Sequence, residues 1–209
     1  GLKEVLCGKI VTFGISPTHP ETGYGYLSLT TTAKDEPLPV KEFIEKPDQA
    51  TAQSLIEMGT YLWNAGIFMF RARDLIEAFE AIAPRFLPPV KQSIIDGKPD
   101  LGFFRLDKKA WSSCENFSID YAIMEHTPNL VAVPFSAGWS DLGDWSAVWE
   151  GMGPNEDGVV ISENAHSIDC TDTLLRSESS AQELIGLGLD NIIAISMPDA
   201  VLVAHKNRT

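Results

Sequence analysis

The hydrophobic positions along the first 150 residues alternate between two spacings, one typical of strands and the other of helices. Strands are predicted where β-branched and apolar residues run together or alternate with polar ones, at 8–15, 25–30, 40–46, 66–70 and 130–135. Helices are predicted where apolar residues recur every three or four positions, at 48–59, 72–83 and 117–126, with a short one reaching residue 150. The remaining stretches predict a hairpin tip at 31–38 and helical and loop material at 86–110.

Local chemistry marks where some of these elements begin and end. Asp48 is expected to cap the helix at 48–59, because its carboxylate can accept a backbone N–H of the first turn. Gly59 is expected to end that helix in the left-handed conformation. The WNAG sequence at 63–66 is predicted to be a turn that leads into a buried strand at 66–70.

The pattern changes after residue 151, where short apolar runs are separated by Asn, Asp, Ser and Gly. These runs predict brief strands with no helix between them, at 158–161, 166–170, 173–176, 184–187, 192–196 and 200–204. The sequence therefore predicts an α/β domain at 1–151 and a β-rich tail at 152–209.

The composition is that of a folded globular protein, and the net charge excludes some classes of binding partner. Of 209 residues, 44% are hydrophobic and 22% are charged, which excludes a disordered chain. The net charge of −13 argues against nucleic acid and anionic membrane surfaces as partners, because both need a basic face. A phosphate substrate stays compatible with this charge if a metal ion or one lysine acts locally.

The sequence contains no signal for a membrane or for secretion. It has no run of ~18 apolar residues, and no charged segment followed by an apolar one opens the chain. Cys7, Cys114 and Cys170 are far apart, which favours reduced thiols over a disulfide framework or a zinc site. We therefore expect a cytoplasmic protein.

A first candidate site is Glu45-Lys46-Pro47, at the end of a predicted strand. A lysine in that position can reach a ligand in the crevice where open α/β sheets bind, and its compact ammonium group suits a phosphate. Glu45 could accept hydrogen bonds from hydroxyl groups. The alternative is a surface ion pair beside a turn proline.

A second candidate is Asp141, which lies between glycines in GWSDLGDW, after a predicted strand and before a short helix. A carboxylate at such a turn is a candidate ligand for a hard cation such as Mg²⁺. The alternative is a local structural role, with Asp144 as the helix N-cap and Asp141 serving the turn.

A third candidate is the WNAG sequence at 63–66, together with PETGYGY at 20–26. Small residues next to an amide, such as Gly66 beside Asn64, allow a ligand to approach the backbone closely. The aromatic residues of both stretches would equally suit a hydrophobic core.

These stretches occur in a definite order: PETGYGY, FIEKP, YLWNAGIFMF, ENFSIDYAIMEHT and GWSDLGDW. In that order they resemble the bacterial mannose-1-phosphate guanylyltransferases of the sugar-1-phosphate nucleotidyltransferase superfamily. The resemblance runs from about residue 8 to residue 150. It implies that 1–151 is the second half of a Rossmann-like catalytic domain. It also implies that 152–209 is a β-rich tail, similar to a left-handed β-helix, through which a homo-oligomer, in particular a dimer, associates.

The resemblance also implies an activity and roles for single residues. The activity is the reaction of GTP with mannose 1-phosphate to give GDP-mannose and pyrophosphate, with Mg²⁺. By position, Lys46 resembles the lysine that holds the sugar phosphate, and Asp141 resembles one of two metal-binding aspartates. The resemblance further implies that Glu45 and Asn64 form hydrogen bonds with the hydroxyl groups of the sugar. It implies that the sugar lies close to the backbone at Gly25 and Gly66.

The chain also departs from that family. The family opens with a glycine-rich Gly-x-Gly-x-Arg loop that wraps the nucleotide triphosphate, and neither this loop nor a second metal aspartate of that half is found here. We therefore expect these 209 residues alone to bind GTP poorly and not to catalyse the formation of GDP-mannose. The alternatives are a sister transferase that uses another sugar or base, and a non-catalytic, oligomerising homologue.

Overall fold

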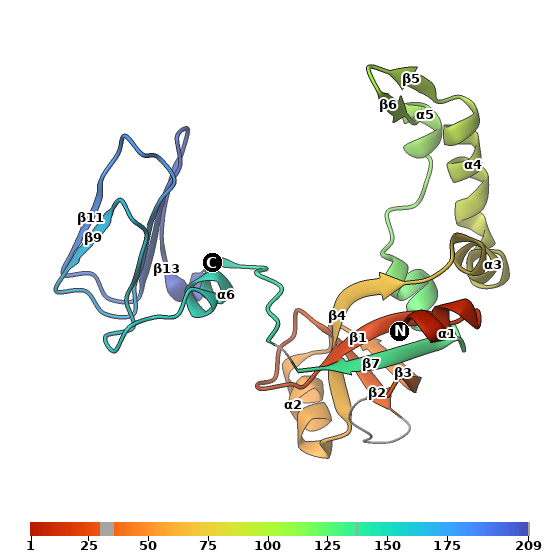
Figure 1. Ribbon diagram of the computed structural model, residues 1–209, viewed down its shortest axis with the longest axis horizontal. Helices are drawn as coiled ribbons and strands as arrows, with labels where there is room; N and C mark the ends of the chain where they lie inside the picture. Colours follow the sequence, from red (N-terminus) through yellow and green to blue (C-terminus); the bar gives the residue numbers. More distant parts are fainter. Residues whose placement is uncertain (30–35, 137, 209) are drawn as a thin grey trace. The chain divides into compact units, whose positions relative to one another are not determined.

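The chain forms two compact units, 1–139 and 140–209, which are described separately (Figure 1). The computed structural model describes residues 1–29, 36–136 and 138–208. The first unit contains a sheet of five long strands with helices around it. The second contains short strands in two small sheets, with one helix packed against the larger sheet. No helix within the described ranges is long and apolar enough to cross a membrane.

The first unit is built on a sheet that closes on itself. Its strands, in the order of pairing, are β1 (Ile10–Ile15), β4 (Tyr61–Met69), β2 (Gly25–Leu29), β3 (Leu38–Glu45) and β7 (Leu130–Phe135). Among these described strands, β1 and β7 pair in parallel and all other pairs are antiparallel. The α/β content is as predicted, and the described strands of this sheet pair mainly in antiparallel fashion.

The strands β2 and β3 pair as the two arms of a hairpin. Their bounds lie within two residues of the strands predicted at 25–30 and 40–46. The hairpin tip predicted at 31–38 falls mostly on residues 30–35, which lie outside the described part of the chain.

Strand β3 meets β7 at one end, through the pairs of Leu38 with Ala132 and Pro39 with Val131. Nearer Glu45, no described residue of β7 pairs with β3. The π-helical turn η2 (Asp120–Met124) packs against β3 there instead. At the Glu45 end of β3, the edge of this strand therefore faces η2 and not another described strand.

The WNAG sequence at 63–66 is part of strand β4, so the predicted turn is wrong. The register between β1 and β4 shifts opposite this stretch, and Gly66 has a φ of 68°, which is the left-handed region that favours glycine. The irregularity is a β-bulge, which uses the same small residues that signal a turn in the sequence. The strand predicted at 66–70 is also not buried, because Ile67 is 53% exposed.

The best-predicted helix is α2 (Gln49–Met58). Its N-cap is Asp48, whose Oδ1 accepts the backbone N–H of Thr51 at 2.8 Å, and Gly59 ends it with a φ of 67°. The other elements around the sheet are α1 (Leu2–Leu6), α3 (Ala72–Ile82), η1 (Pro84–Phe86) and η2, which replaces the regular helix predicted at 117–126.

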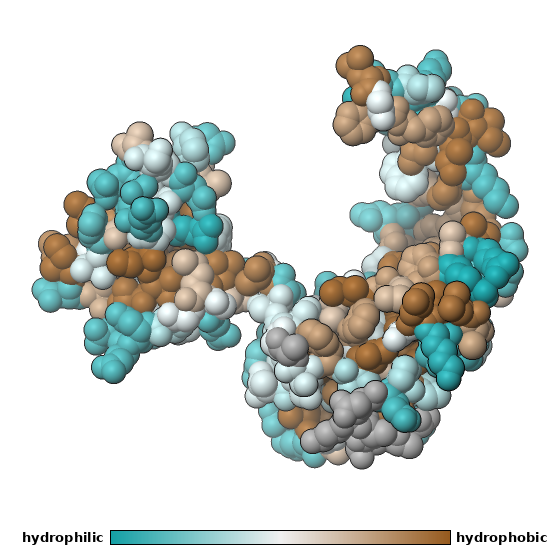
Figure 2. All heavy atoms as spheres, in the orientation of Figure 1, coloured by the Kyte–Doolittle hydropathy of each residue, from teal (hydrophilic) through white to brown (hydrophobic). Residues whose placement is uncertain are grey.

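An arm of the first unit extends away from the sheet, drawn in yellow-green and green in Figure 1. It consists of α4 (Leu87–Ile95), β5 (Lys98–Asp100), β6 (Phe103–Arg105) and α5 (Lys108–Trp111). The β5–β6 hairpin is not predicted from the sequence, because its strands are three residues long and carry no alternating pattern. Figure 2 shows hydrophobic side chains gathered on this arm, and Phe103 is 72% exposed.

The second unit confirms the predicted short strands. They are β8 (Val160–Ile161), β9 (Ala165–Ile168), β10 (Leu174–Ser177), β11 (Leu184–Leu187), β12 (Ile192–Ser196) and β13 (Val201–His205), followed by η3 (Lys206–Arg208). Strands β8, β10 and β12 pair in parallel, and β9 pairs in parallel with β11. The chain thus passes back and forth between two parallel sheets, and β13 is added to the larger sheet as an antiparallel strand.

Helix α6 (Trp145–Gly151) belongs to this second unit. Its Trp145, Val148 and Trp149 pack against the buried side chains of β8, β10 and β12. This packing explains why the compact units divide at 139, earlier along the chain than the boundary predicted at 151.

Candidate functional site

Three of the predicted site residues lie side by side on adjacent strands of the first unit. Gly25 pairs directly with Glu45, and Tyr26, the next residue of β2, pairs with Trp63, the next-door neighbour of Asn64 on β4. Because side chains alternate between the faces of a sheet, Glu45 and Asn64 point to the same face, with Gly25 between them. The absence of a side chain at Gly25 therefore leaves a gap between two polar groups.

Gly25 has no room for a side chain. A Cβ atom at this position would lie 2.6 Å from Oε2 of Glu45 and 3.1 Å from Cζ of Phe43. The carboxylate of Glu45 therefore extends across the backbone of Gly25, into the gap. By contrast, Gly66 is exposed with open space around its Cα, and only its φ of 68° favours glycine there.

Lys46 follows Glu45 at the turn from β3 into α2. It has a φ of 47°, which is uncommon for a residue other than glycine, and its N–H donates to the carbonyl of Tyr24 at 3.2 Å. Pro47 is buried and Asp48 caps α2, so the backbone is held on both sides of Lys46. The Lys46 side chain itself is exposed.

Asn64 is held by a residue that the sequence analysis does not single out. Thr12 of β1 is fully buried, and its Oγ1 donates to Oδ1 of Asn64 at 2.7 Å and lies 3.2 Å from the carbonyl of Ile67. Because this bond occupies the Asn64 oxygen, the amide presents its NH₂ group as the donor. Such a donor suits the oxygen of a hydroxyl group.

Glu45 lies among charges contributed by two segments. Partial burial raises the pKa of Glu45 from 4.5 to about 7, and Asp120 and Glu125 of the η2 segment add to this, while the neighbouring Lys46 lowers it. Oε1 of Glu125 accepts the backbone N–H of Glu45 at 3.1 Å. Neither acidic residue of the η2 segment is a candidate from the sequence, since both are some 75 residues or more away along the chain.

A prediction follows from the raised pKa of Glu45. Ionising this carboxyl costs free energy in the folded protein, so the wild type loses stability relative to Glu45→Gln as the pH rises from 4.5 to about 7. The Gln variant is therefore expected to raise the melting temperature more at pH 8 than at pH 5. Thermal unfolding at both values tests this, with the exposed Glu36→Gln as control. An equal gain at both pH values would contradict it.

Asp141 belongs to the second unit, in the segment before α6. Its Oδ1 accepts the N–H of Gly143 at 3.0 Å, and Leu142 between them has a φ of 50°. Asp144 caps α6 by accepting the N–H of Ala147 at 2.8 Å, which is the structural role that the alternative interpretation of this stretch predicts. Asp141 thus takes part in a tight turn, whose backbone fixes the direction of its carboxylate.

A divalent cation would need more ligands than Asp141 offers. Mg²⁺ prefers six oxygen ligands, of which one or two carboxylates and several phosphate or water oxygens are typical. The part of the chain that the structure describes has no group of three or more His, Cys, Asp or Glu side chains that could hold a metal. A cation at Asp141 would therefore need most of its ligands from outside the described residues, such as substrate phosphates and water.

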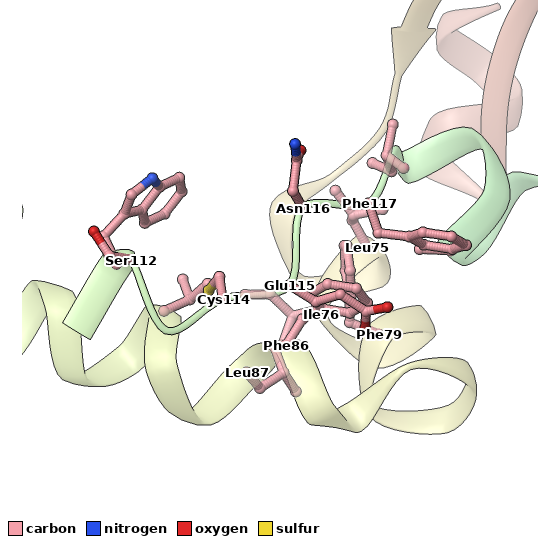
Figure 3. Close-up of a pocket in the computed structure, with 14 residues that line it drawn as sticks. Leu75, Ile76, Phe79, Phe86, Leu87, Ser112, Cys114, Glu115, Asn116 and Phe117 are labelled. Carbon is pink, nitrogen blue, oxygen red and sulfur yellow. The ribbon is translucent and has the colours of Figure 1, made fainter. Parts of the chain in front are cut away.

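A separate cavity of about 620 Å³ lies between α3, η1, α4 and the segment that leads to η2 (Figure 3). Its lining is mainly apolar, and Phe79, Phe86 and Phe117 meet there, while Asn116 points away. Glu115 at the rim forms an ion pair with Arg85, at 2.8 Å. Because this cavity brings together almost no polar groups, it does not resemble a site for a sugar phosphate.

Comparison with known proteins identifies the family. A model of the nucleotidyl transferase family matches residues 6–157, which include all five strands of the closed sheet, the Glu45–Lys46 turn and Asp141. The chain belongs to the nucleotidyl transferase family. Nucleotidyl transferases of this family generally use divalent metal ions.

Curated relatives in this family cover nearly the whole chain. The mannose-1-phosphate guanylyltransferase RfbM of Salmonella typhimurium is 39% identical over 200 residues, or 96% of this chain and 41% of that protein. The mannose-1-phosphate guanylyltransferase of Escherichia coli K12 is 37% identical over 96% of this chain and 42% of that protein. The xanthan biosynthesis protein XanB of Xanthomonas campestris is 41% identical over the same shares. The chain thus spans about two fifths of the length of the curated relatives it matches.

Solved structures of this family share the fold. A Thermus thermophilus structure titled mannose-1-phosphate geranyltransferase superposes with a TM-score of 0.80 and 26% identity, over 99% of this chain and 58% of that one. A Helicobacter pylori structure titled mannose-6-phosphate isomerase has a TM-score of 0.60 and 28% identity, over 67% of this chain and 54% of that one. The fold of this chain, with mixed α/β content and a β-rich part, is therefore found in both solved structures, over the shares given.

Proposed function

We propose that this chain is the sugar-phosphate-binding part of a mannose-1-phosphate guanylyltransferase. The observation that carries the proposal is the row of Glu45, Gly25 and Asn64 on three adjacent strands, with Lys46 directly after it. This row places a carboxylate, a residue without a side chain and an amide donor on adjacent strands, and a lysine follows the carboxylate in sequence. Relatives at 37% to 41% identity that are named for this activity, or for xanthan biosynthesis, support the proposal.

In this proposal each residue acts on mannose 1-phosphate. The ammonium group of Lys46 binds the phosphate, Glu45 and Asn64 hydrogen-bond sugar hydroxyls, and the sugar approaches the backbone at Gly25 and Gly66. A phosphate oxygen of the sugar phosphate attacks the α-phosphorus of GTP, the bond to the β-phosphate breaks, and pyrophosphate leaves. The residues contribute by holding the nucleophile in line and by balancing its charge.

The cation proposed for this reaction is Mg²⁺, with Asp141 as one of its protein ligands. When bound, Mg²⁺ neutralises charge on the reacting phosphates. The proposal places the glycine-rich nucleotide loop outside these 209 residues, because they contain no Gly-x-Gly-x-Arg sequence. The domain at 1–151 is then one half of a Rossmann-like catalytic domain, and the β-rich tail at 152–209, a left-handed β-helix in this proposal, serves association into a dimer.

Calorimetric titration of the purified chain tests this function. Mannose 1-phosphate is expected to bind at one site, about tenfold or more tightly than glucose 1-phosphate, because Glu45 and Asn64 recognise the sugar hydroxyls. Inorganic phosphate alone is expected to bind more weakly than either. Equal affinity for the three ligands, or no binding, would contradict the proposal. Formation of GDP-mannose by these 209 residues alone would contradict the placement of the nucleotide loop.

A further inference from the structure

The backbone N–H of Glu45 points away from the hairpin partner of its strand. Lys46, the next residue, donates its N–H to Tyr24 on the β2 side, and successive N–H groups of a strand point to opposite edges. The N–H of Glu45 therefore faces the other edge of β3. At that edge the described residues of β7 pair with β3 only at Leu38 and Pro39, far from Glu45.

The side chain of Glu125 fills this gap in the pairing. Its Oε1 accepts the N–H of Glu45 at 3.1 Å, across 80 residues of sequence. A carboxylate that accepts a backbone N–H forms a charge-assisted bond, which is stronger than a bond between neutral groups. Glu125 thus replaces a strand partner for the single residue that precedes Lys46.

Glu125 is itself held in a fixed position. It follows η2, whose Ile123 and Met124 are almost fully buried in the same core as Phe43 of β3. Its N–H donates to the carbonyl of Asp120 five residues earlier, at 3.0 Å, which is the hydrogen bond of a π-helix. Such turns are rare and occur frequently at functional sites, because the extra residue redirects the side chains that follow it.

We propose that Glu125 is a positioning residue of the sugar-phosphate site. It fixes the peptide plane before Glu45, and through it the direction of the Glu45 carboxylate and the start of the turn that carries Lys46. The inference rests on the proposed function, because its effect is exerted on mannose 1-phosphate through Glu45 and Lys46. Glu125 does not touch the substrate.

The charge of Glu125 gives a second, ligand-free measure of the same contact. Glu125 is one of the groups that raise the pKa of Glu45, together with Asp120, whereas Lys46 lowers it. Replacing Glu125 by a neutral residue is therefore expected to lower the pKa of Glu45. A residue with only a remote structural role would not change this value.

Two variants at this position separate the hydrogen bond from the charge. Glu125→Gln keeps an oxygen that can accept the N–H of Glu45, and Glu125→Ala removes the acceptor. Mannose 1-phosphate is expected to bind the Ala variant about tenfold more weakly and the Gln variant nearly as tightly as the wild type. The Glu45 amide should exchange with solvent faster in the Ala variant only, and the pKa of Glu45, from carbon-13 NMR, should fall in both.

The exposed Glu115→Gln, in the segment before η2, is the matched control and should change none of these measurements. Unchanged affinity and amide exchange in a folded Glu125→Ala chain would overturn the role of Glu125 alone. If the Ala variant does not fold, the Gln variant decides: an unchanged pKa of Glu45 would overturn the proposal. A wild-type chain that does not bind mannose 1-phosphate would instead overturn the proposed function, and with it the positioning role.

Discussion

Lys46→Ala is expected to weaken the binding of mannose 1-phosphate about 30-fold, which corresponds to ~2 kcal/mol for one charge-assisted hydrogen bond. The ammonium group is the positive charge that the site offers to the phosphate in a chain of net charge −13. The fold should be unaffected, because the Lys46 side chain is exposed. Alanine also has a Cβ atom, so the φ of 47° costs it about as much free energy as it costs lysine. Calorimetric titration measures the affinity, and thermal unfolding checks the fold.

The chain offers a matched control for this substitution. Lys41 is an exposed lysine on β3, five positions before Lys46, and removing it changes the net charge by the same amount. Lys41→Ala should leave the affinity within about twofold, because separated surface charges are screened by salt. Equal losses in the two variants would show that Lys46 acts only through the overall charge, which would contradict its role in holding the phosphate.

Thr12→Val is expected to destabilise the chain by ~1–3 kcal/mol and also to weaken mannose 1-phosphate binding. Valine fills the same space but has no hydroxyl, so Oδ1 of Asn64 loses its donor in a fully buried setting. The Asn64 amide is then free to rotate, and its NH₂ group no longer points reliably at the ligand. Urea unfolding and calorimetric titration measure the two effects.

Thr12→Ser separates the hydroxyl from the methyl group. Serine keeps the donor to Asn64 but loses one buried methyl group, which costs ~1 kcal/mol of unfolding free energy. The Ser variant should therefore be less stable than the wild type and still bind mannose 1-phosphate normally. If the Val and Ser variants bind the ligand equally well, Thr12 does not orient Asn64.

The sequence predicts those elements whose signals are local. Helix α2 has its cap at Asp48 and its stop at Gly59, and the brief strands of the second unit have turn residues on either side, so each is found almost to the residue. The same local signal misleads at 63–66, where small residues belong to a β-bulge and not to a turn. A bulge depends on the register with β1, which no short stretch of β4 encodes.

In the candidate site, too, some residues can be predicted from local sequence and others cannot. Glu45 and Asn64, which stand in the motifs, lie on the same face of the sheet, on strands that both pair with β2. Thr12 and Glu125 are missed, because they reach the site across 52 and 80 residues of sequence. Thr12 stands outside the motifs, and Glu125 stands in ENFSIDYAIMEHT, where no residue is given a role from the sequence. A search for polar residues in predicted core positions would find Thr12, which lies in an otherwise apolar strand.

The left-handed backbone at Lys46 has a consequence for attempts to make this protein more robust. A residue with a side chain pays ~1–2 kcal/mol for a φ near 47°, and glycine does not. Selection for heat resistance alone would therefore drift toward glycine at position 46, away from the ammonium group. Any library meant to improve this chain should hold position 46 constant, because stability there favours glycine and the proposed binding of phosphate requires lysine.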